Sequence, residues 1–166
     1  AAYQMQLAYR KRGYAFAEVD YQIEKNDFTK VTFTISEGPR VIIRTITFSG
    51  NQAFNDDALK AFFEKDRTGL FGMGELPFVR SDFNAAVDEI RQSYIAQGYL
   101  DVVVEAPKLE FAEDRSYVDC YIAIQEGLQY TVSRIEFHGD IIADATNNLD
   151  RIRQKLIGQP YFNRKK

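Results

Sequence analysis

Few side chains in this 166-residue chain could do acid–base or nucleophilic chemistry. It has one histidine and one cysteine, which excludes an internal disulfide and a cysteine-based zinc site. His138 lies in Phe137-His138-Gly139, at the end of an expected strand, which favours a surface residue over a general base. Cys120 shares the period-two apolar face of Val118 and Ile122, so we expect a small core residue rather than a reactive thiol.

The remaining polar clusters have ordinary structural explanations. The carboxylate pairs Asp56-Asp57 and Glu113-Asp114 fall at an expected helix start and in a loop, where the helix dipole and solvent account for them. Gly69, Gly72 and Gly74 lack the Lys-Ser/Thr that follows the glycines of a phosphate-binding loop. We therefore interpret the chain as a protein that is not an enzyme and that uses no metal or cofactor.

Composition excludes two further classes. The net charge is −3 with both signs interspersed, so the chain lacks the basic stripe that an α-β-β nucleic-acid module would need. No apolar run approaches the roughly 20 residues that span a bilayer. The sequence opens within an expected helix without a signal peptide, and that absence says nothing about the compartment.

The elements that position these side chains come in copies. Tyr9, Gly13 and Tyr14 recur 85 positions later as Tyr94, Gly98 and Tyr99. A second set recurs 89 positions later: Glu37, Gly38, Ile46, Phe48 and Gly50 return as Glu126, Gly127, Ile135, Phe137 and Gly139, with Ser49 at the place of His138. Self-similarity at a fixed period indicates a tandem repeat.

The repeat divides the chain into three segments. We predict one complete unit at residues 39–127, the back half of a unit (α-β-β) at 1–38, and the front half of another (β-α) at 128–166. Pro39 keeps the joint after Gly38 extended, so we expect a short, stiff linker.

Apolar periodicity and turn residues give the order β-α-α-β-β in each unit. Asn55 and Ser81 are the expected N-caps of the two helices in the complete unit. The expected strands are 16–24, 30–36, 41–48, 99–106, 116–125 and 130–137; the flanking helices are 1–12 and 147–157; the interhelical loop is 67–80.

These motifs resemble the POTRA domains of BamA-type outer-membrane protein assembly factors, within the surface-antigen family. The resemblance rests on Ile-x-Phe-x-Gly ending the first strand, Tyr-x-x-x-Gly-Tyr ending the second helix, and Glu-Gly ending the last strand. It implies an α+β fold of tandem POTRA-like β-α-α-β-β modules, each a three-stranded sheet covered on one face by two helices. The motif residues expected to hold this fold are Gly13, Tyr14, Glu37, Gly38, Gly50, Tyr94, Gly98, Tyr99, Glu126, Gly127 and Gly139.

Two surfaces are candidates for protein binding. The resemblance places the second strand at a sheet edge, where free N–H and C=O groups accept an extended segment or are blunted by charge. The 67–80 loop either docks a partner or packs over the helices. The edge candidates are Tyr99, Leu100, Asp101, Val102, Val103, Val104 and Glu105, with 16–24 as the earlier copy; the loop candidates are Leu70, Phe71, Met73, Leu76 and Phe78.

The resemblance also implies partners and a compartment. It predicts a periplasmic scaffold that handles unfolded outer-membrane proteins or accessory assembly subunits by strand addition, ahead of a C-terminal β-barrel of the same protein. The alternative is a rigid spacer, or a division- or secretion-type POTRA interaction domain without client binding. Because 1–38 and 128–166 are complementary halves of one unit, we also expect them to pair between molecules.

Overall fold

The computed structural model describes residues 1–25, 29–64, 75–139 and 143–161, without the side chains of 143–146. Helices and strands are interspersed along these residues, as an α+β fold requires. The elements in chain order are α1 (Ala2–Arg10), β1 (Glu18–Lys25), β2 (Thr29–Ser36), β3 (Ile42–Ser49), α2 (Asp56–Glu64), β4 (Leu76–Pro77), α3 (Arg80–Ala96), β5 (Val103–Val104), β6 (Lys108–Phe111), β7 (Tyr117–Gln125) and α4 (Ala143–Leu156).

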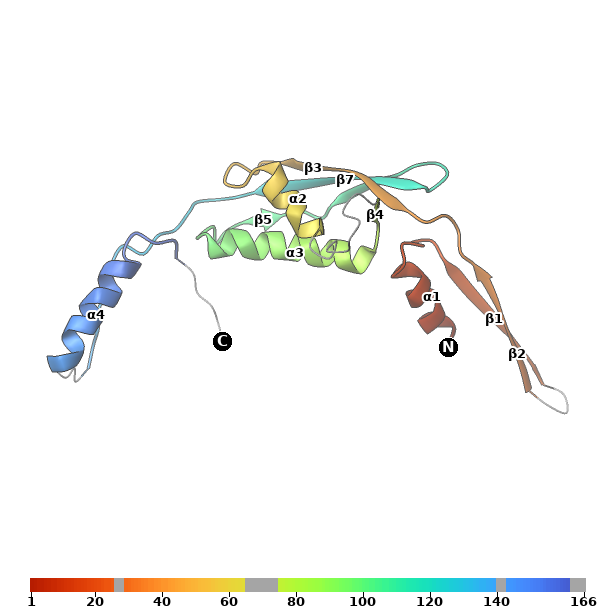
Figure 1. Ribbon diagram of the computed structural model, residues 1–166, viewed down its shortest axis with the longest axis horizontal. Coiled ribbons are helices and arrows are strands. Elements are labelled where there is room, and N and C mark those ends of the chain that lie inside the picture. Colours follow the sequence, from red (N-terminus) through yellow and green to blue (C-terminus); the bar gives the residue numbers. More distant parts are fainter. Residues whose placement is uncertain (26–28, 65–74, 140–142, 162–166) are drawn as a thin grey trace.

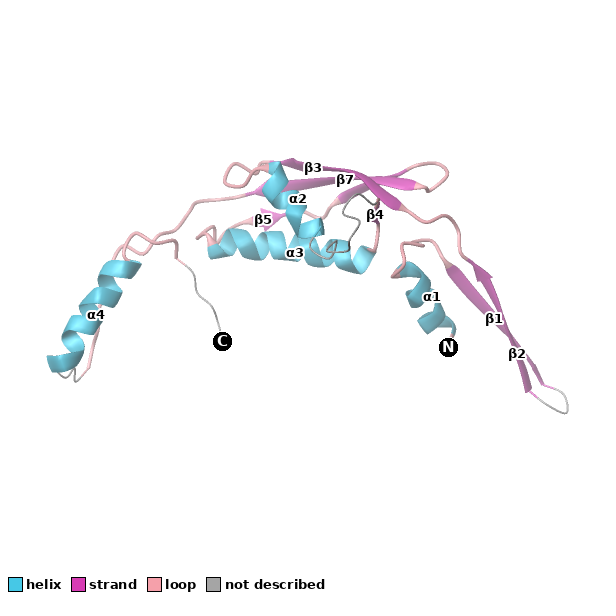
Figure 2. Ribbon diagram, in the orientation of Figure 1, coloured by secondary structure: helices cyan, strands magenta, loops and turns pink. Residues whose placement is uncertain are grey.

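The central unit is a mixed sheet with α2 and α3 on one face (Figures 1 and 2). β7 lies in the middle, parallel to β3 on one side and antiparallel to β5 and β6 on the other. Parallel neighbours need a long crossover, which here contains both helices. The predicted β-α-α-β-β fold is confirmed, with two additions: β4 pairs with the start of β3, and the second strand is split into β5 and β6.

The core lies between the sheet and the two helices. Alternate residues of β7 point into it, and Cys120 among them is 0% exposed, which confirms the prediction of a core cysteine. The matching face of α3 buries Phe83, Ala86, Ile90 and Tyr94 at helical spacing. This is an apolar helix stripe packed on an apolar strand face, the arrangement that stabilises an α+β unit.

One of the two predicted helix caps is confirmed. The Asn55 side-chain oxygen accepts the N–H of Ala58 at 2.8 Å. The prediction for Ser81 is wrong, because α3 begins one residue earlier, at Arg80, after Val79 in an extended conformation. Ser81 is then inside the first turn, and its hydroxyl donates to a neighbouring carboxylate instead of capping the helix.

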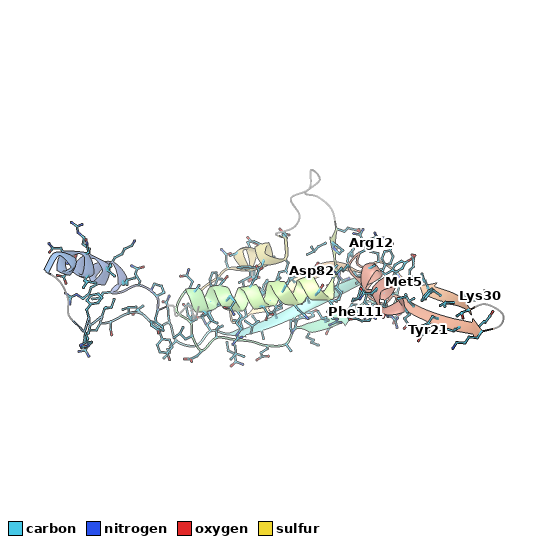
Figure 3. The ribbon with its side chains drawn as sticks, turned by 90° about the horizontal axis from the view of Figure 1, so that it is seen from below. Met5, Arg12, Tyr21, Lys30, Asp82 and Phe111 are labelled. Carbon is cyan, nitrogen blue, oxygen red and sulfur yellow. The ribbon has the colours of Figure 1, made fainter. Side chains whose placement is uncertain are left out.

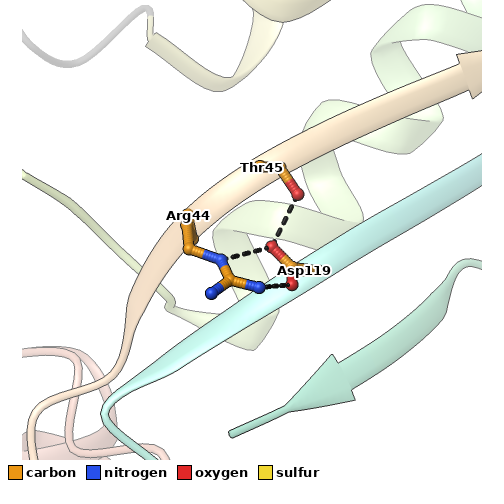
Figure 4. A network of polar contacts seen from close by, with 3 residues as sticks. All are labelled: Arg44, Thr45 and Asp119. Carbon is orange, nitrogen blue, oxygen red and sulfur yellow. Dashed lines mark hydrogen bonds and ion pairs between the residues drawn. The ribbon is translucent and has the colours of Figure 1, made fainter.

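A polar network fastens β3 to β7 where their register shifts (Figure 4). Arg44 is the extra residue between the paired positions Ile43 and Thr45. Its guanidinium donates twice to the Asp119 carboxylate, once through Nε at 3.0 Å, and the Thr45 hydroxyl donates to the same carboxylate at 2.6 Å. The Arg44 hydrogen bond lowers the pKa of Asp119, which is 8% exposed. Charge-assisted bonds thus hold the two parallel strands together at their irregular point.

The segment before the central unit is a helix against a hairpin. β1 and β2 pair antiparallel without a break, from Glu18 opposite Ser36 to Lys25 opposite Thr29. Helix α1 packs against β1, and the Gln6 side chain donates to the carbonyl of residue 17 at 2.9 Å.

The segment after the central unit differs from its prediction. The prediction of a strand at 130–137 is wrong. Gln129 and Thr131 form isolated bridges, and residues 132–138 form no strand. In the central unit the matching strand, β3, is held by β7. The described residues offer 132–138 no such neighbour, and strands form only in pairs. The following helix starts earlier than expected, at Ala143.

The three segments lie in a row, with both flanking segments bent toward the helical side of the central unit (Figure 1). None of the helices in the described ranges is both long enough and apolar enough to cross a membrane.

The repeat is visible in the geometry as well as in the letters. The rings of Tyr9 and Tyr14 pack edge to face, with centroids 6.0 Å apart and planes at 83°. Those of Tyr94 and Tyr99 pack in the same way, with centroids 5.7 Å apart and planes at 82°. The Tyr94 hydroxyl donates to Glu126 Oε1 at 2.9 Å, and interaction with the matching glutamate, Glu37, raises the pKa of Tyr9. The Tyr and Glu of the motif therefore form one contact, which ties the end of the helix to the end of the last strand.

Gly50 has no room for a side chain, and we predict that Gly50→Ala unfolds the central unit more readily than a matched substitution. A Cβ there would lie 2.0 Å from the Ile124 carbonyl oxygen, at φ +80°. Gly127→Ala is the control, since its φ is +72° but its nearest neighbour is 3.2 Å away. Urea denaturation should show a loss of about 1–2 kcal/mol for the positive φ in both, and about 3 kcal/mol or more for Gly50→Ala. Equal losses would contradict the close approach.

We predict that Tyr94→Phe destabilises the fold at neutral pH by about 1–3 kcal/mol, because it removes a bond to a carboxylate. Burial, and then the Glu126 contact, raise the pKa of Tyr94 well above its ordinary value of 10.0. A raised folded-state pKa gives stability that is fully present below the unfolded pKa and is lost as pH rises through the folded one. Wild-type stability should therefore fall above about pH 10 more steeply than that of Tyr94→Phe.

The control for this pH dependence is Tyr121→Phe, which removes a phenol from a ring that is 39% exposed. The stability of Tyr121→Phe should fall with rising pH as steeply as that of the wild type. If Tyr94→Phe and Tyr121→Phe gave the same slope, the buried phenol would not be its source.

Candidate protein-binding surface

The residues that could do chemistry are kept apart. His138 is exposed, with Nε2 3.5 Å from a Glu136 carboxylate oxygen. Cys120 lies in the core, where burial and then the neighbouring Asp119 raise its pKa to about 12. Within the described ranges, no three His, Cys, Asp or Glu side chains gather to hold a metal ion. The remaining candidate sites are surfaces, above all the open edges of the sheets.

The edge strand of the central unit lies further along the chain than predicted. Of the predicted residues 99–105, Tyr99 forms a bridge to Gln129, Leu100 and Asp101 form a turn, and Val102 is buried. Only 103–105 pair with β7, through β5 and the bond from the Glu105 N–H to the carbonyl of residue 123. The reason is the turn that follows Gly98, whose carbonyl accepts the N–H of Leu100 at 3.1 Å.

The edge then continues to residue 111 but is interrupted; we call 103–111 the broken edge. Val104 faces Ile124 and Lys108 faces Tyr121, so the edge has one residue more than β7 between these pairs, which is a β-bulge. Pro107 lies in this bulge and has no N–H to offer. The ion pair of Lys108 with Glu110, at 2.7 Å, adds charge along the edge. Bulge, proline and charge are the features that protect a sheet edge from strand addition.

The matching strand of the first segment has no bulge and no proline, although Glu18, Asp20 and Glu24 carry charge along it; we call β1 the continuous edge. All eight of its residues, Glu18–Lys25, pair with β2 in one register. The sheet contains only these two strands among the described residues, so the other side of β1 is unpaired. Seven of the eight side chains are exposed. The continuous edge therefore offers an uninterrupted row of main-chain donors and acceptors.

The apolar loop divides into two parts. Leu70, Phe71 and Met73 lie outside the described residues. Leu76 is half-buried in β4, and Phe78 is 0% exposed. The docking hypothesis is wrong for Phe78, because its ring packs in the core against the rings of Phe83 and Phe111. The distances between ring centroids are 5.7 and 5.6 Å.

The joints between segments are built twice in the same way. The N–H of Val41 donates to the Gly13 carbonyl at 2.8 Å, and the N–H of Tyr130 donates to the Gly98 carbonyl at 2.8 Å. Both glycines have positive φ, +92° and +89°, and both end a helix. At the first joint, the rings of Phe16 and Phe111 also meet edge to face at 5.1 Å.

Each joint also contains a proline that the sequence analysis passed over. Pro77 pairs with Ile42, and Pro160 pairs with Thr131 at the matching register. The residue after each proline donates its N–H to a carbonyl at the start of the next unit, Phe78 to Val41 and Tyr161 to Tyr130. The signal was available, since Pro-Phe at 77 and Pro-Tyr at 160 are a third repeated pair, 83 positions apart.

Three comparisons place these observations among known proteins. The POTRA family profile, described as surface antigen variable number repeat, matches residues 2–38 and 41–127. The outer membrane protein assembly factor BamA of Nitratidesulfovibrio vulgaris is 26% identical over 141 residues, 81% of this chain and 17% of the relative. BamA of Buchnera aphidicola is 24% identical over 119 residues, 70% of this chain and 19% of the relative.

Among solved structures, BamA from Haemophilus ducreyi lacking POTRA domains 1–3 is similar, with a TM-score of 0.51 and 21% identity. The match covers 75% of this chain and 22% of that one, and it supports the fold. The chain thus spans less than a fifth of the length of the two curated relatives. The repeated Tyr–Glu contact, the repeated joint and the family match together show that this chain belongs to the POTRA family of surface-antigen repeats.

Proposed function

We propose that this chain is part of the periplasmic scaffold of an outer-membrane protein assembly factor. The proposal is supported by its membership of the POTRA family and by two curated relatives that are assembly factors. In this role the units bind unfolded outer-membrane proteins or accessory subunits and orient them toward a β-barrel of the same protein. A scaffold of this kind needs exposed binding surface and no catalytic group.

The binding step is strand addition on the continuous edge. An extended client segment pairs with the unpaired side of β1, so that main-chain bonds carry the affinity. Such bonds contain little sequence information, which suits a receptor for many different clients. The single observation that carries this proposal is the unbroken eight-residue pairing of β1 with β2, which leaves the outer side of β1 open and without a bulge.

The broken edge is the poorer acceptor. A segment added beside β5 and β6 would meet the bulge and Pro107, and could form main-chain bonds only on either side of them. Clients should therefore prefer residues 18–25 to residues 103–111.

A second candidate function is that of a rigid spacer. It is favoured by the repeated joint, in which Val41 and Tyr130 bond the glycine carbonyls at the same 2.8 Å. Under this proposal the units set the distance and angle between other domains and bind no client.

A titration with a peptide from a β-barrel strand separates the two functions. Chemical-shift mapping should perturb the amides of residues 18–25 most strongly. The same peptide, N-methylated at alternate residues along one edge, is the matched control, because its side chains are unchanged while its main-chain donors are lost. With each net hydrogen bond worth about 1 kcal/mol, loss of two should weaken binding by at least about tenfold.

Three results would contradict strand addition: equal affinity for both peptides, perturbation confined to the chain ends, or perturbation concentrated on residues 103–111. No binding of either peptide would leave the spacer function as the better account.

A further inference from the structure

A groove of about 360 Å³ lies at the first joint, between α1 of the first segment and the start of α3 of the central unit. Figure 1 shows α1 next to the start of α3, and Figure 3 labels Arg12 just after α1 and Asp82 in the first turn of α3. The apolar side chains that line the groove are buried or half-buried, and the basic ones are exposed. The apolar residues are Leu7, Ala15 and Val79, and the basic residues are Arg10, Lys11 and Arg80. We call this the joint groove.

The basic side chains of the joint groove have no acidic partner in the part of the chain that the structure describes. None of the described lining residues is a carboxylate. Neither Arg10, Lys11 nor Arg80 forms an ion pair with a described carboxylate. The nearby Asp82 carboxylate accepts the Ser81 hydroxyl at 2.8 Å instead. Since the chain as a whole has a net charge of −3, the groove is a local excess of positive charge.

A complete first unit would leave the joint groove open. The central unit is complete, so the groove positions can be checked at the residues 85 positions later. The counterparts of Leu7, Lys11 and Ala15 are Gln92, Ala96 and Leu100. All three counterparts are exposed, although β3 and α2 are in place in their unit. A further strand and helix in the first unit would therefore not cover these positions.

We propose that the joint groove binds an acidic segment of a partner protein, with an apolar side chain on the floor and carboxylates at the basic rim. Carboxylates form strong charge-assisted hydrogen bonds with guanidinium and ammonium groups, and arginine can bind them through two N–H groups at once. The buried apolar floor favours a protein segment over other anions. A free anion has no apolar group to place there, and a flat membrane surface does not enter a groove between two helices.

The bound segment contacts both sides of the joint. Lys11 belongs to the first segment and Arg80 to the central unit, and the distance between these units is fixed by the bond from the Val41 N–H to the Gly13 carbonyl at 2.8 Å. A site that is already formed costs less to bind than one that must first be assembled. Recognition of the acidic segment uses none of the residues of the continuous edge. The inference therefore depends neither on strand addition nor on a role in assembly.

The test titrates the whole chain with the peptide acetyl-Glu-Glu-Leu-Leu-Glu-Glu-amide, which has apolar side chains between carboxylates. Chemical-shift mapping should perturb the amides of residues 7–15 and 79–84 most strongly. The matched peptide with Gln in place of every Glu has the same size and the same apolar centre but no side-chain charge. It should bind at least about tenfold more weakly. Affinity for the acidic peptide should also fall as salt is added, because salt screens exposed charges.

Charge reversals on the two sides of the groove locate the site. Lys11→Glu and Arg80→Glu should each weaken binding of the acidic peptide by about threefold to tenfold, because an attraction becomes a repulsion. Arg91→Glu is the matched control. Arg91 lies on the same helix as Arg80, is exposed and does not line the groove, so the variant has the same net charge but should bind like the wild type.

Four results would overturn the proposal. Equal affinity for the two peptides, or equal weakening by Arg80→Glu and Arg91→Glu, would show that no specific charge contact is made. Perturbation of residues 18–25 in place of the groove would assign the acidic peptide to the continuous edge. No binding of the peptide at millimolar concentration would also contradict it, including the case in which the chain binds phosphatidylglycerol vesicles and the basic residues face a lipid surface.

Discussion

One main-chain hydrogen bond fixes each unit to the next. The glycine that ends a helix turns its carbonyl toward the first residues of the following unit, and Val41 and Tyr130 donate to the two carbonyls at 2.8 Å. Carbonyls at a helix end have no partner inside the helix, and this bond gives each of the two a donor in the next unit. The positive φ of Gly13 and Gly98 makes the turn possible at little cost. The direction in which the array grows is therefore set by backbone geometry.

The units share these joints and motif contacts but differ in the sheet edge that each one exposes. The Tyr–Glu contact recurs in the central unit and the first segment, and so does the edge-to-face pair of tyrosine rings. The edges do not recur: β1 is continuous, while its counterpart is broken at Pro107. Units of one fold can thus differ in the regularity of their sheet edge, since a single proline and a bulge change the edge without changing the core.

The repeat made most of the fold predictable, because motif residues with fixed roles return at fixed offsets. Gly50 ends a strand and Asn55 caps a helix, and both were identified from residue type and position. What failed depended on tertiary partners. Serine is a residue type that favours the N-cap, which is why Ser81 was expected there. The N–H of Phe78 is bonded to the Val41 carbonyl, and α3 begins at Arg80, one residue before Ser81. Residues 130–137 have the pattern of a strand, but a strand needs a neighbour.

The sequence predicted that the candidate site is a sheet edge, but it did not predict which residues form that edge. The edge was expected at 99–105, because the β-branched run around Val103 begins soon after Gly98. The turn after Gly98 delays the strand, and the bulge at Pro107 carries it on to residue 111. Neither feature is visible in periodicity alone, since a turn and a bulge change register by single residues. The difference between the two edges emerged only from the pairing.

The most direct test of the tandem arrangement is amide hydrogen exchange at the joints. If the units are linked by the glycine-carbonyl bond, the amides of Val41 and Tyr130 should exchange far more slowly than those of an unstructured peptide. Val41 should be the slower of the two, because the joint it belongs to adds the packing of Phe16 on Phe111 and its side chain is fully buried. Exchange of both amides at the rate of an unstructured chain would contradict the account.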